Sequence, residues 1–467
     1  MILGSSTSRE LGAGHRRSAS PPQLFVLSFI VLILFGTIGL KVLPGIYAAE
    51  PLNWLDALFT ATSAVCVTGL TVVDTATYFT RWGQGFILLL IQLGGLGMIT
   101  FATLIIASLG RRLSLAQEEI TAGAAVVAPN VEYRHLARSV VLFTLVMEAA
   151  GALILWLLWF RQLGPASALW HAVFQAISAF CNAGFSTFSD SLMGFQLAPG
   201  VLLTIMMLIV VGGIGFLTMD ELYLAQRAHA GARPFRISLH TRLVLATTAI
   251  LLLGGCVVYL ASEWNATLGD MPVWARVANA LFMSVTARTA GFNTVDYSQA
   301  EDGTDFFTIL LMAIGGSPGS TAGGIKTTTF ALIGLLAWSR LRGDRVVNIA
   351  GRSVPDETVQ RSVGLFAAAF GAMTLAILLY TYTEGGMGFG AGRNTPFLAF
   401  MFEAVSAFNT VGLSMGVTPD LSPAGRVLTV VLMYVGRVGP LTFAAAIALR
   451  AHSARGFRYA YENVVVG

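Results

Sequence analysis

The chain has 467 residues, of which 55% are hydrophobic and only 11% are charged, and its formal net charge is +4. Because a soluble domain carries about 25% charged residues, this composition excludes an ordinary soluble protein and predicts an integral membrane protein. Apolar runs unbroken over about 20 residues indicate helices, since the strands of a membrane barrel alternate over about 10 residues. The three cysteines and six histidines lack the spacing of a disulfide framework or a zinc site.

Four units of the same plan are predicted between a polar tail (1–20) and a second tail (451–467). Each unit has a spanning helix, an apolar helix that is too short to cross a membrane, and a second span. The units are 21–110, 139–226, 243–340 and 362–450, with linkers at 111–138, 227–242 and 341–361. The first spans are 23–41, 140–159, 243–260 and 363–382. The short helices are 53–64, 171–180, 273–286 and 396–407. The second spans are 86–109, 199–224, 306–338 and 426–449.

A glycine loop follows each short helix. Each loop is a triplet that ends in glycine and precedes Leu or Phe, and successive glycines are about 107 to 121 residues apart. The four triplets are Val67, Thr68, Gly69; Asn182, Ala183, Gly184; Thr289, Ala290, Gly291; and Thr410, Val411, Gly412. A second glycine cluster follows each loop within the next span. Two linked motifs that recur four times predict four repeated structural units.

The basic residues predict the orientation of the chain in the membrane. Most of the 28 lysines and arginines lie in the two tails and the three linkers. The positive-inside rule therefore places both termini and all linkers in the cytoplasm. The four short helices then enter from the outside, which gives eight spans and four re-entrant helices.

The short helices and their loops predict a cation pathway. A short helix that ends at membrane depth cannot face lipid, because its last carbonyl groups would lack partners, but it is tolerated around a water-filled pathway. The C-terminal end of each helix carries about half a negative charge, which favours a cation. Glycine permits conformations that aim carbonyls at the axis, and rings of backbone carbonyls replace the hydration shell of potassium.

The second span of the third unit is interrupted, since glycine and proline destabilise a helix by about 1 and 3 kcal/mol relative to alanine. The interruption consists of Gly315, Gly316, Ser317, Pro318, Gly319, Ser320, Thr321, Ala322, Gly323 and Gly324. Irregular backbone at this depth is expected to line a pathway. Lys326 and Arg437 are basic side chains at a similar depth, where a charge must be paired or face water. We expect Arg437 to narrow the pathway below the glycine loops and to contact this segment.

Together these features resemble the Ktr/Trk/HKT superfamily of potassium transporters over about residues 22–450, and most closely the Ktr-type membrane subunit, with the Trk type as a near relative. The resemblance implies an all-α membrane protein with four outer helix–pore helix–inner helix repeats around a pseudo-fourfold pore. It implies potassium uptake across the plasma membrane through a selectivity filter formed by the four glycine loops, in which K⁺ binds to backbone carbonyls. The filter glycines would be Gly69, Gly184, Gly291 and Gly412.

The same resemblance carries expectations about selectivity and gating. A serine in the first repeat goes with sodium preference in plant relatives, so four glycines imply potassium selectivity. Residues 315–326 would be an intramembrane gating loop, and Lys326 and Arg437 would belong to the gate. A dependence on sodium stays open. An alternating-access cation carrier is the alternative, because such carriers also use broken helices at the membrane midplane.

The expected partner proteins are inferred from the resemblance alone. It implies a homodimer in the cell membrane and a separate cytosolic ring of nucleotide-binding regulatory subunits of the Ktr or Trk type. Potassium, and sodium if it is coupled, would be the only ions, with no organic cofactor and no nucleic acid. The basic linkers would suit anionic membrane lipids equally well. Residues 319–327 resemble a phosphate loop, but the lysine is one residue late and no strand–loop–helix unit surrounds it, so we expect no enzyme.

The sequence also suggests roles for four further charged residues. Arg288 is expected to point behind the glycine loops, toward Glu301, Asp302 or Asp305. Asp74 and Asp296 either attract cations at the mouth of the pathway or cap a local turn. Glu403 is expected to hold its short helix through hydrogen bonds.

Overall fold

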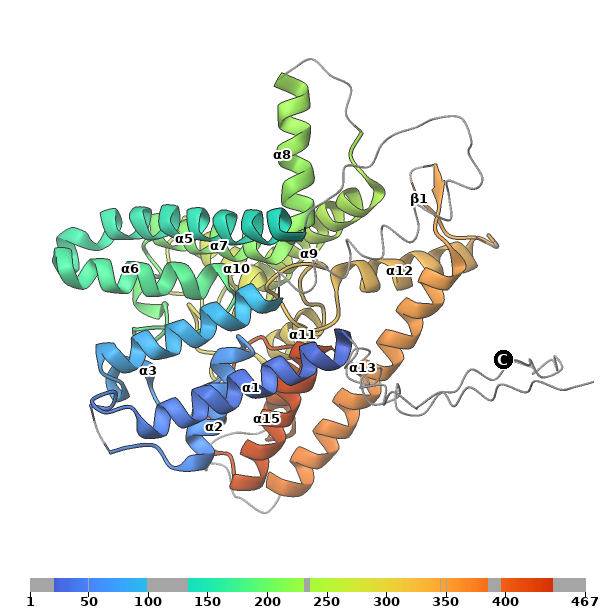
Figure 1. The fold of residues 1–467 in the computed structure, drawn as a ribbon. Coiled ribbons are helices and arrows are strands. Elements are labelled where there is room, and N and C mark those ends of the chain that lie inside the picture. The colour runs from blue at the N-terminus through green and yellow to red at the C-terminus, as the bar shows by residue number, and fades with distance from the viewer. Residues whose placement is uncertain are drawn as a thin grey trace, which may run out of the picture.

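The structure is a computed structural model that describes residues 21–48, 50–98, 133–230, 236–344, 346–349, 351–384 and 396–439. Figure 1 shows that this part of the chain is mostly helical, with irregular loops between the helices and one short β-hairpin. The two predicted tails, most of the first linker, the end of the first unit beyond 98 and the end of the last span beyond 439 lie outside the described residues. The predicted helical architecture is confirmed for the described residues.

The described elements follow the predicted order. The long helices that open the units are α1 (Pro21–Val42), α5 (Tyr133–Leu163), α9 (Leu239–Glu263) and α13 (Asp356–Glu384). The short helices are α2 (Trp54–Val65), α6 (Pro165–Phe180), α10 (Val273–Thr286) and α14 (Pro396–Phe408). The closing segments are a helix over 81–98, α7 (Pro199–Ile214) with α8 (Phe216–Ala230), α11 (Asp302–Met312) with α12 (Thr327–Leu341), and α15 (Pro423–Val438). Smaller elements are α3 (Thr75–Tyr78), η1 (Met193–Phe195), η2 (Thr418–Asp420), β1 (Asn348–Ile349) and β2 (Arg352–Ser353).

Within the described residues, four helices are long and apolar enough to cross a membrane, namely α1, α5, α9 and α13. The bent pair of α7 and α8 would supply a fifth span. The helix 81–98 and α15 both reach the edge of the described residues, and the last span of the third unit is interrupted. The predicted count of eight spans therefore stays a prediction.

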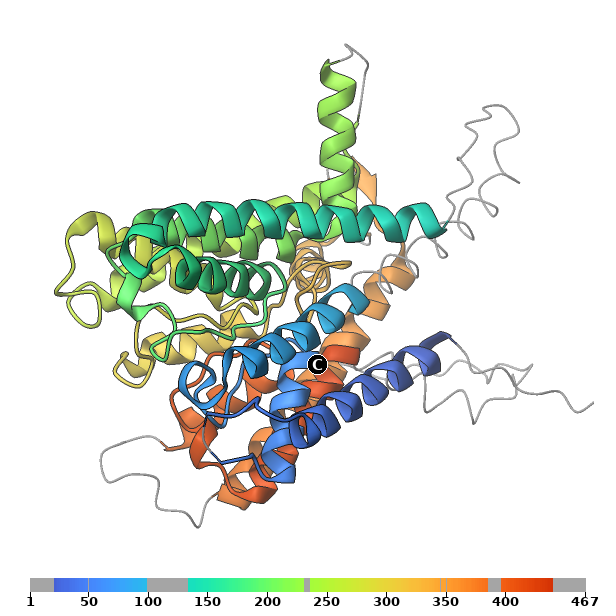
Figure 2. The ribbon, with the colours of Figure 1, turned by 60° about the vertical axis from the view of Figure 1, so that its left-hand side comes forward.

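The predicted span 199–224 is not a single helix. α7 ends at Ile214, and α8 leaves it at an angle of 99°. Gly215 between them has φ +94°, and a Cβ atom there would lie 2.7 Å from the carbonyl oxygen of Pro318. Only glycine combines this conformation with so close an approach. As a result α8 stands away from the other helices, as both Figure 1 and Figure 2 show.

The closing helix of each unit packs against the short helix of the next unit. α7 contacts α10, α11 contacts α14, and α15 contacts α2, so that the last unit meets the first. The helix 81–98 meets α6 through a hydrogen bond from Trp170 Nε1 to Gln84 Oε1 (2.7 Å). An ion pair of 2.5 Å between Arg426 and Asp56 joins the last and first units. The four units therefore follow one another in a closed cycle.

Candidate functional site

The four glycine loops, 67–69, 182–184, 289–291 and 410–412, lie in one ring at the centre of this cycle. A Cβ atom built on any of the loop glycines would lie 3.0 to 3.2 Å from the Cα of the next one. The cyclic order is Gly69, Gly184, Gly291, Gly412 and back to Gly69. Each short helix ends at most five residues before its glycine, so the partial negative charge of its C-terminal end lies close to the ring.

Backbone carbonyl oxygens fill the space beside each glycine. A Cβ atom on any of the four would lie within 3.0 Å of the carbonyl oxygen that precedes the glycine of a neighbouring loop, closer than ordinary van der Waals contact. These oxygens belong to Ala183 beside Gly69, Ala290 beside Gly184, Val411 beside Gly291 and Thr68 beside Gly412. The ring therefore presents main-chain oxygen and has no room for a side chain.

The loops adopt a backbone conformation that is rare outside glycine. The four loop glycines have φ between +71° and +93°. The residues two positions earlier also have positive φ, between +51° and +68°, and they are Val67, Asn182, Thr289 and Thr410. Three of these side chains are β-branched, for which the conformation costs about 1–3 kcal/mol each. The surrounding structure must therefore hold the loops in place.

Buried hydroxyl groups supply part of this support, and the sequence interpretation missed them. Each hydroxyl belongs to a short helix and bonds the backbone of its own glycine loop or of the residue just after it. The bonds are Gly69 N–H to Ser63 Oγ (3.1 Å), Gly412 N–H to Ser406 Oγ (3.1 Å), Ser178 Oγ to Phe185 O (2.7 Å) and Thr286 Oγ1 to Phe292 O (2.5 Å). All four hydroxyl side chains are fully buried. The signal was a serine six residues before the glycine in three of the four motifs.

A cavity of about 310 Å³ lies over one face of the ring, and all four loop glycines line it. Asp74 and Asp296 also line this cavity. Asp74 caps α3 by accepting a hydrogen bond from Ala76 N–H (2.9 Å), and Asp296 accepts one from Ser298 N–H (2.8 Å). Each carboxylate was expected either to attract cations at the mouth of the pathway or to cap a local turn. Because Asp74 and Asp296 line the cavity and also accept these backbone hydrogen bonds, the two roles are compatible.

The 315–326 segment lies against the other face of the ring. A Cβ atom on Gly323 would lie 2.1 Å from Thr410 Oγ1, which places the segment directly beside the fourth glycine loop. The amide of Ser317 donates to the carbonyl of Gly213 in α7 (2.9 Å), and the amide of Thr321 donates to Gly212 (3.2 Å). The segment is therefore fastened to the second unit while it lies beneath the fourth.

Arg437 joins this segment to the end of α15. Its side chain is fully buried, and its guanidinium donates to the carbonyl of Thr321 (2.5 Å) and to the carbonyl of Gly94 (3.4 Å). The expected contact with the 315–326 segment is thus present. The same contact reaches the helix 81–98 of the first unit.

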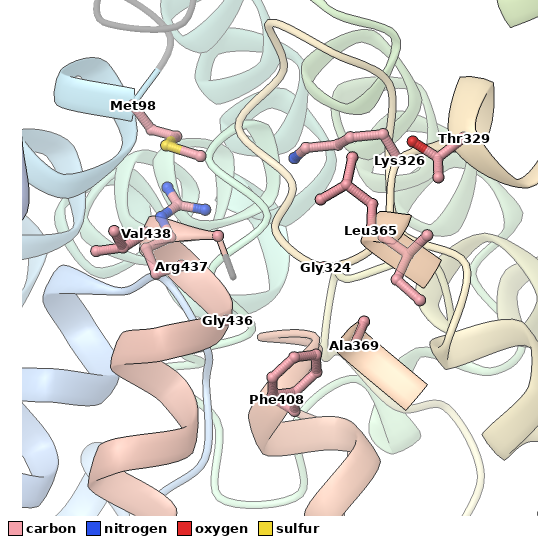
Figure 3. Close-up of a pocket in the computed structure, with 12 residues that line it drawn as sticks. Met98, Gly324, Lys326, Thr329, Leu365, Ala369, Phe408, Gly436, Arg437 and Val438 are labelled. Carbon is pink, nitrogen blue, oxygen red and sulfur yellow. The ribbon is translucent and has the colours of Figure 1, made fainter. Parts of the chain in front are cut away.

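A second cavity, of about 250 Å³, lies between the segment and α15 (Figure 3). Lys326 and Arg437 both extend into it, and Met98 lies beside Arg437. The Lys326 ammonium donates to the carbonyl of Ala322 (2.6 Å). No acidic side chain of the described residues lines this cavity. Two basic side chains therefore share one cavity just beyond the ring.

The other predicted charges have clear neighbours. Arg288 is buried and donates to the carbonyl of Gly315 (3.3 Å), at the start of the 315–326 segment. The hydrogen bond of Arg288 is thus made to a carbonyl, whereas a carboxylate was expected. Glu403 accepts hydrogen bonds from Ser414 Oγ (2.9 Å) and Thr418 Oγ1 (2.5 Å), so it ties α14 to the chain after its glycine loop as expected.

Comparisons with known proteins identify the family and the fold. A family model described as TrkH, cation transport protein, matches residues 13–459. The chain is 39% identical to the Ktr system potassium uptake protein B of Bacillus subtilis, over 96% of this chain and 97% of that protein. It is 35% identical to the potassium/sodium uptake protein NtpJ of Enterococcus hirae, over 97% of this chain and 98% of that one. The crystal structure of the potassium transporter TrkH from Vibrio parahaemolyticus has the same fold, with a TM-score of 0.72 at 20% identity, over 92% of this chain and 85% of the other.

Proposed function

The chain belongs to the TrkH family of cation transport proteins, and we propose that it takes up potassium ions through the ring of glycine loops. It is a transporter and not an enzyme. Relatives that align with nearly its whole length are named as potassium uptake proteins. In our proposal the ring is a selectivity filter in the plasma membrane, with both termini in the cytoplasm.

The closed ring of four glycines is the observation that carries the proposal. Backbone carbonyls that surround one site can replace the hydration shell of a potassium ion. The ends of the four short helices add partial negative charge at the same place. The cyclic order of the units supports a central pore over the alternating-access alternative, since such carriers are commonly built from inverted repeats.

The 315–326 segment and the two basic side chains are proposed to form the gate. An ion that leaves the ring on this side meets Lys326 and Arg437, whose positive charges oppose its passage. Opening would require the segment to move away from Thr410 and Arg437 to release Thr321. The names of the Ktr-system relatives support operation within a system of several components. A cytosolic regulatory ring and a homodimer are part of the proposal.

The test is rescue of a cell that lacks its own potassium uptake. We expect the wild-type chain to restore growth at low potassium, and Gly69→Ser to lose preference for potassium over sodium. Gly254→Ser is the control, because a Cβ atom built on Gly254 meets no other part of the described structure within 4 Å beyond its chain neighbours and the backbone of its own helix. Parallel cultures with and without sodium decide whether sodium is coupled. Failure of the wild type to rescue, or an unchanged ion preference in Gly69→Ser, would overturn the proposal.

A further inference from the structure

A cavity of about 350 Å³ lies at the linker side of the molecule, far along the chain from the glycine loops. Arg236, Arg242 and Arg352 line it, together with Ile237, Leu239 and Gly351. The first two arginines precede or begin α9, and the third lies in the hairpin of β1 and β2. None of the three forms an ion pair with another described residue. Three arginine residues from two separate segments thus line one space.

The nearby carboxylate is already engaged. Glu221 of α8 accepts hydrogen bonds from the backbone amide and hydroxyl of Ser238 and from the hydroxyl of Thr241, at the start of α9. It therefore fixes the first turn of α9. The described lining of the cavity itself holds three arginines and no carboxylate.

The two walls of the cavity are fixed relative to each other. Val347, Ile349 and Val354 of the hairpin belong to one apolar cluster with Leu239 and Leu243 of α9. A backbone hydrogen bond from Val354 N–H to Val347 O (2.9 Å) closes the base of the hairpin. Arg352 is therefore held near Arg242 by packing, rather than carried on a free loop.

Arg242 also stands at the head of an exposed apolar stripe. Residues 4, 8, 11 and 15 positions further along α9 lie on the same helix face. They are Ala246, Ile250, Leu253 and Val257, and the last three are 70%, 64% and 65% exposed. At 1.5 Å per residue the stripe extends about 22 Å from Arg242 to Val257. That is more than half of the roughly 30 Å hydrocarbon thickness of a bilayer, so the stripe is long enough for an acyl chain within one leaflet.

We propose that this cavity binds the phosphate headgroup of an anionic phospholipid, with an acyl chain along the Ile250–Leu253–Val257 stripe. A free phosphate compound would use the arginines but not the stripe, and the continuity between the two favours the lipid. The assignment of the lipid to the cytoplasmic leaflet rests on the proposed orientation of the chain. The hairpin also packs on Leu335 and Leu336 of α12, which begins directly after the 315–326 segment. A bound lipid would therefore hold α12 in place beside α9.

The test uses the full-length protein purified in detergent and measures retained lipid by mass spectrometry after exchange into mixed phosphatidylglycerol and phosphatidylcholine. The pocket variant is Arg236→Gln with Arg242→Gln and Arg352→Gln. The charge-matched control is Arg138→Gln with Arg227→Gln and Arg361→Gln, which alters exposed arginines elsewhere on the described surface. Each anionic contact contributes about 1 kcal/mol, so the pocket variant should bind phosphatidylglycerol on the order of one hundredfold more weakly. The single variant Arg352→Gln, on the exposed hairpin, should show a smaller loss if the triple variant does not fold.

The proposal is supported if phosphatidylglycerol is retained over phosphatidylcholine by the wild type and the control but not by the pocket variant. An equal loss of phosphatidylglycerol from both triple variants would mean that the lipid is held only by non-specific electrostatic attraction to surface arginines, and it would overturn the proposal. Competition by inorganic phosphate as strong as that by the lipid would assign the cavity to a free phosphate compound instead. Unchanged lipid retention in the pocket variant would also overturn the proposal. The arginines would then be assigned to the binding of an acidic protein surface. Potassium flux in pure phosphatidylcholine vesicles, measured on the same samples, reports separately on the proposed function.

Discussion

The guanidinium of Arg437 donates a hydrogen bond to the carbonyl of Thr321, although the two residues are 116 positions apart and both side chains are fully buried. This bond links the last helix of the fourth unit to the 315–326 segment of the third. It lies beside a cavity that holds a second positive charge, on Lys326. In the proposed gate, the hydrogen bond between Arg437 and Thr321 holds the 315–326 segment in its closed position.

Arg437→Ala is expected to increase potassium flux. A hydrogen bond to a charged group contributes about 1.5–3 kcal/mol, so its loss should shift the balance between closed and open gate on the order of ten- to a hundredfold. Flux into vesicles that hold purified protein measures the change, with the exposed Arg361→Ala as control. Equal flux in wild type and Arg437→Ala would show that the side chain does not restrain the segment.

The hydroxyl groups of Ser63 and Ser406 should matter for ion preference. Each accepts the N–H of a loop glycine, and its removal should loosen a strained loop by about 1 kcal/mol. We expect the double variant Ser63→Ala with Ser406→Ala to admit more sodium, seen as a severalfold lower ratio of potassium to sodium permeation. Thr374→Ala is the control, because it removes a hydroxyl that bonds only its own helix on the exposed surface. A wild-type ratio in the double variant contradicts a supporting role for the serines.

The four loop glycines should differ in their tolerance of alanine. A Cβ on Gly412 would lie 2.1 Å from the Thr68 oxygen, whereas the closest atom to one on Gly184 is 3.0 Å away. Both positions have positive φ, so both variants carry the same kind of backbone strain. We therefore expect Gly412→Ala to abolish uptake and Gly184→Ala to retain part of it. Rubidium uptake by whole cells, corrected for the amount of protein in the membrane, ranks the two variants. Higher uptake by Gly412→Ala than by Gly184→Ala would contradict the carbonyl contacts.

Gly215 should be as sensitive as the loop glycines, although it lies outside them. Alanine there would have to adopt φ +94° and approach the Pro318 carbonyl to 2.7 Å. The 315–326 segment should then shift, with a loss of about 1–2 kcal/mol for the backbone conformation alone. We expect Gly215→Ala to unfold at lower temperature and to alter gating, while Gly254→Ala behaves as wild type. Identical unfolding and flux in the two variants would show that the bend does not hold the segment.

The sequence was most informative where one motif recurs. The short helix 273–286 has the predicted bounds, and the helix predicted at 53–64 is shifted by a single residue at each end. The bend at Gly215 was missed because it depends on the carbonyl of Pro318, which only the folded chain brings there. The partner of Arg288 was predicted among acidic residues, since charge is visible in a sequence and a free backbone carbonyl is not. The serine hydroxyls were visible in three motifs, but their role depends on distances within the folded loops.

The central claim is that the four glycine loops form one binding site for a dehydrated potassium ion. The most direct measurement is anomalous X-ray scattering from crystals in which rubidium replaces potassium. We expect rubidium density inside the ring of Gly69, Gly184, Gly291 and Gly412, and its loss in Gly412→Ala. Rubidium density that lies only outside this ring, or a ring that stays empty in rubidium, would contradict it.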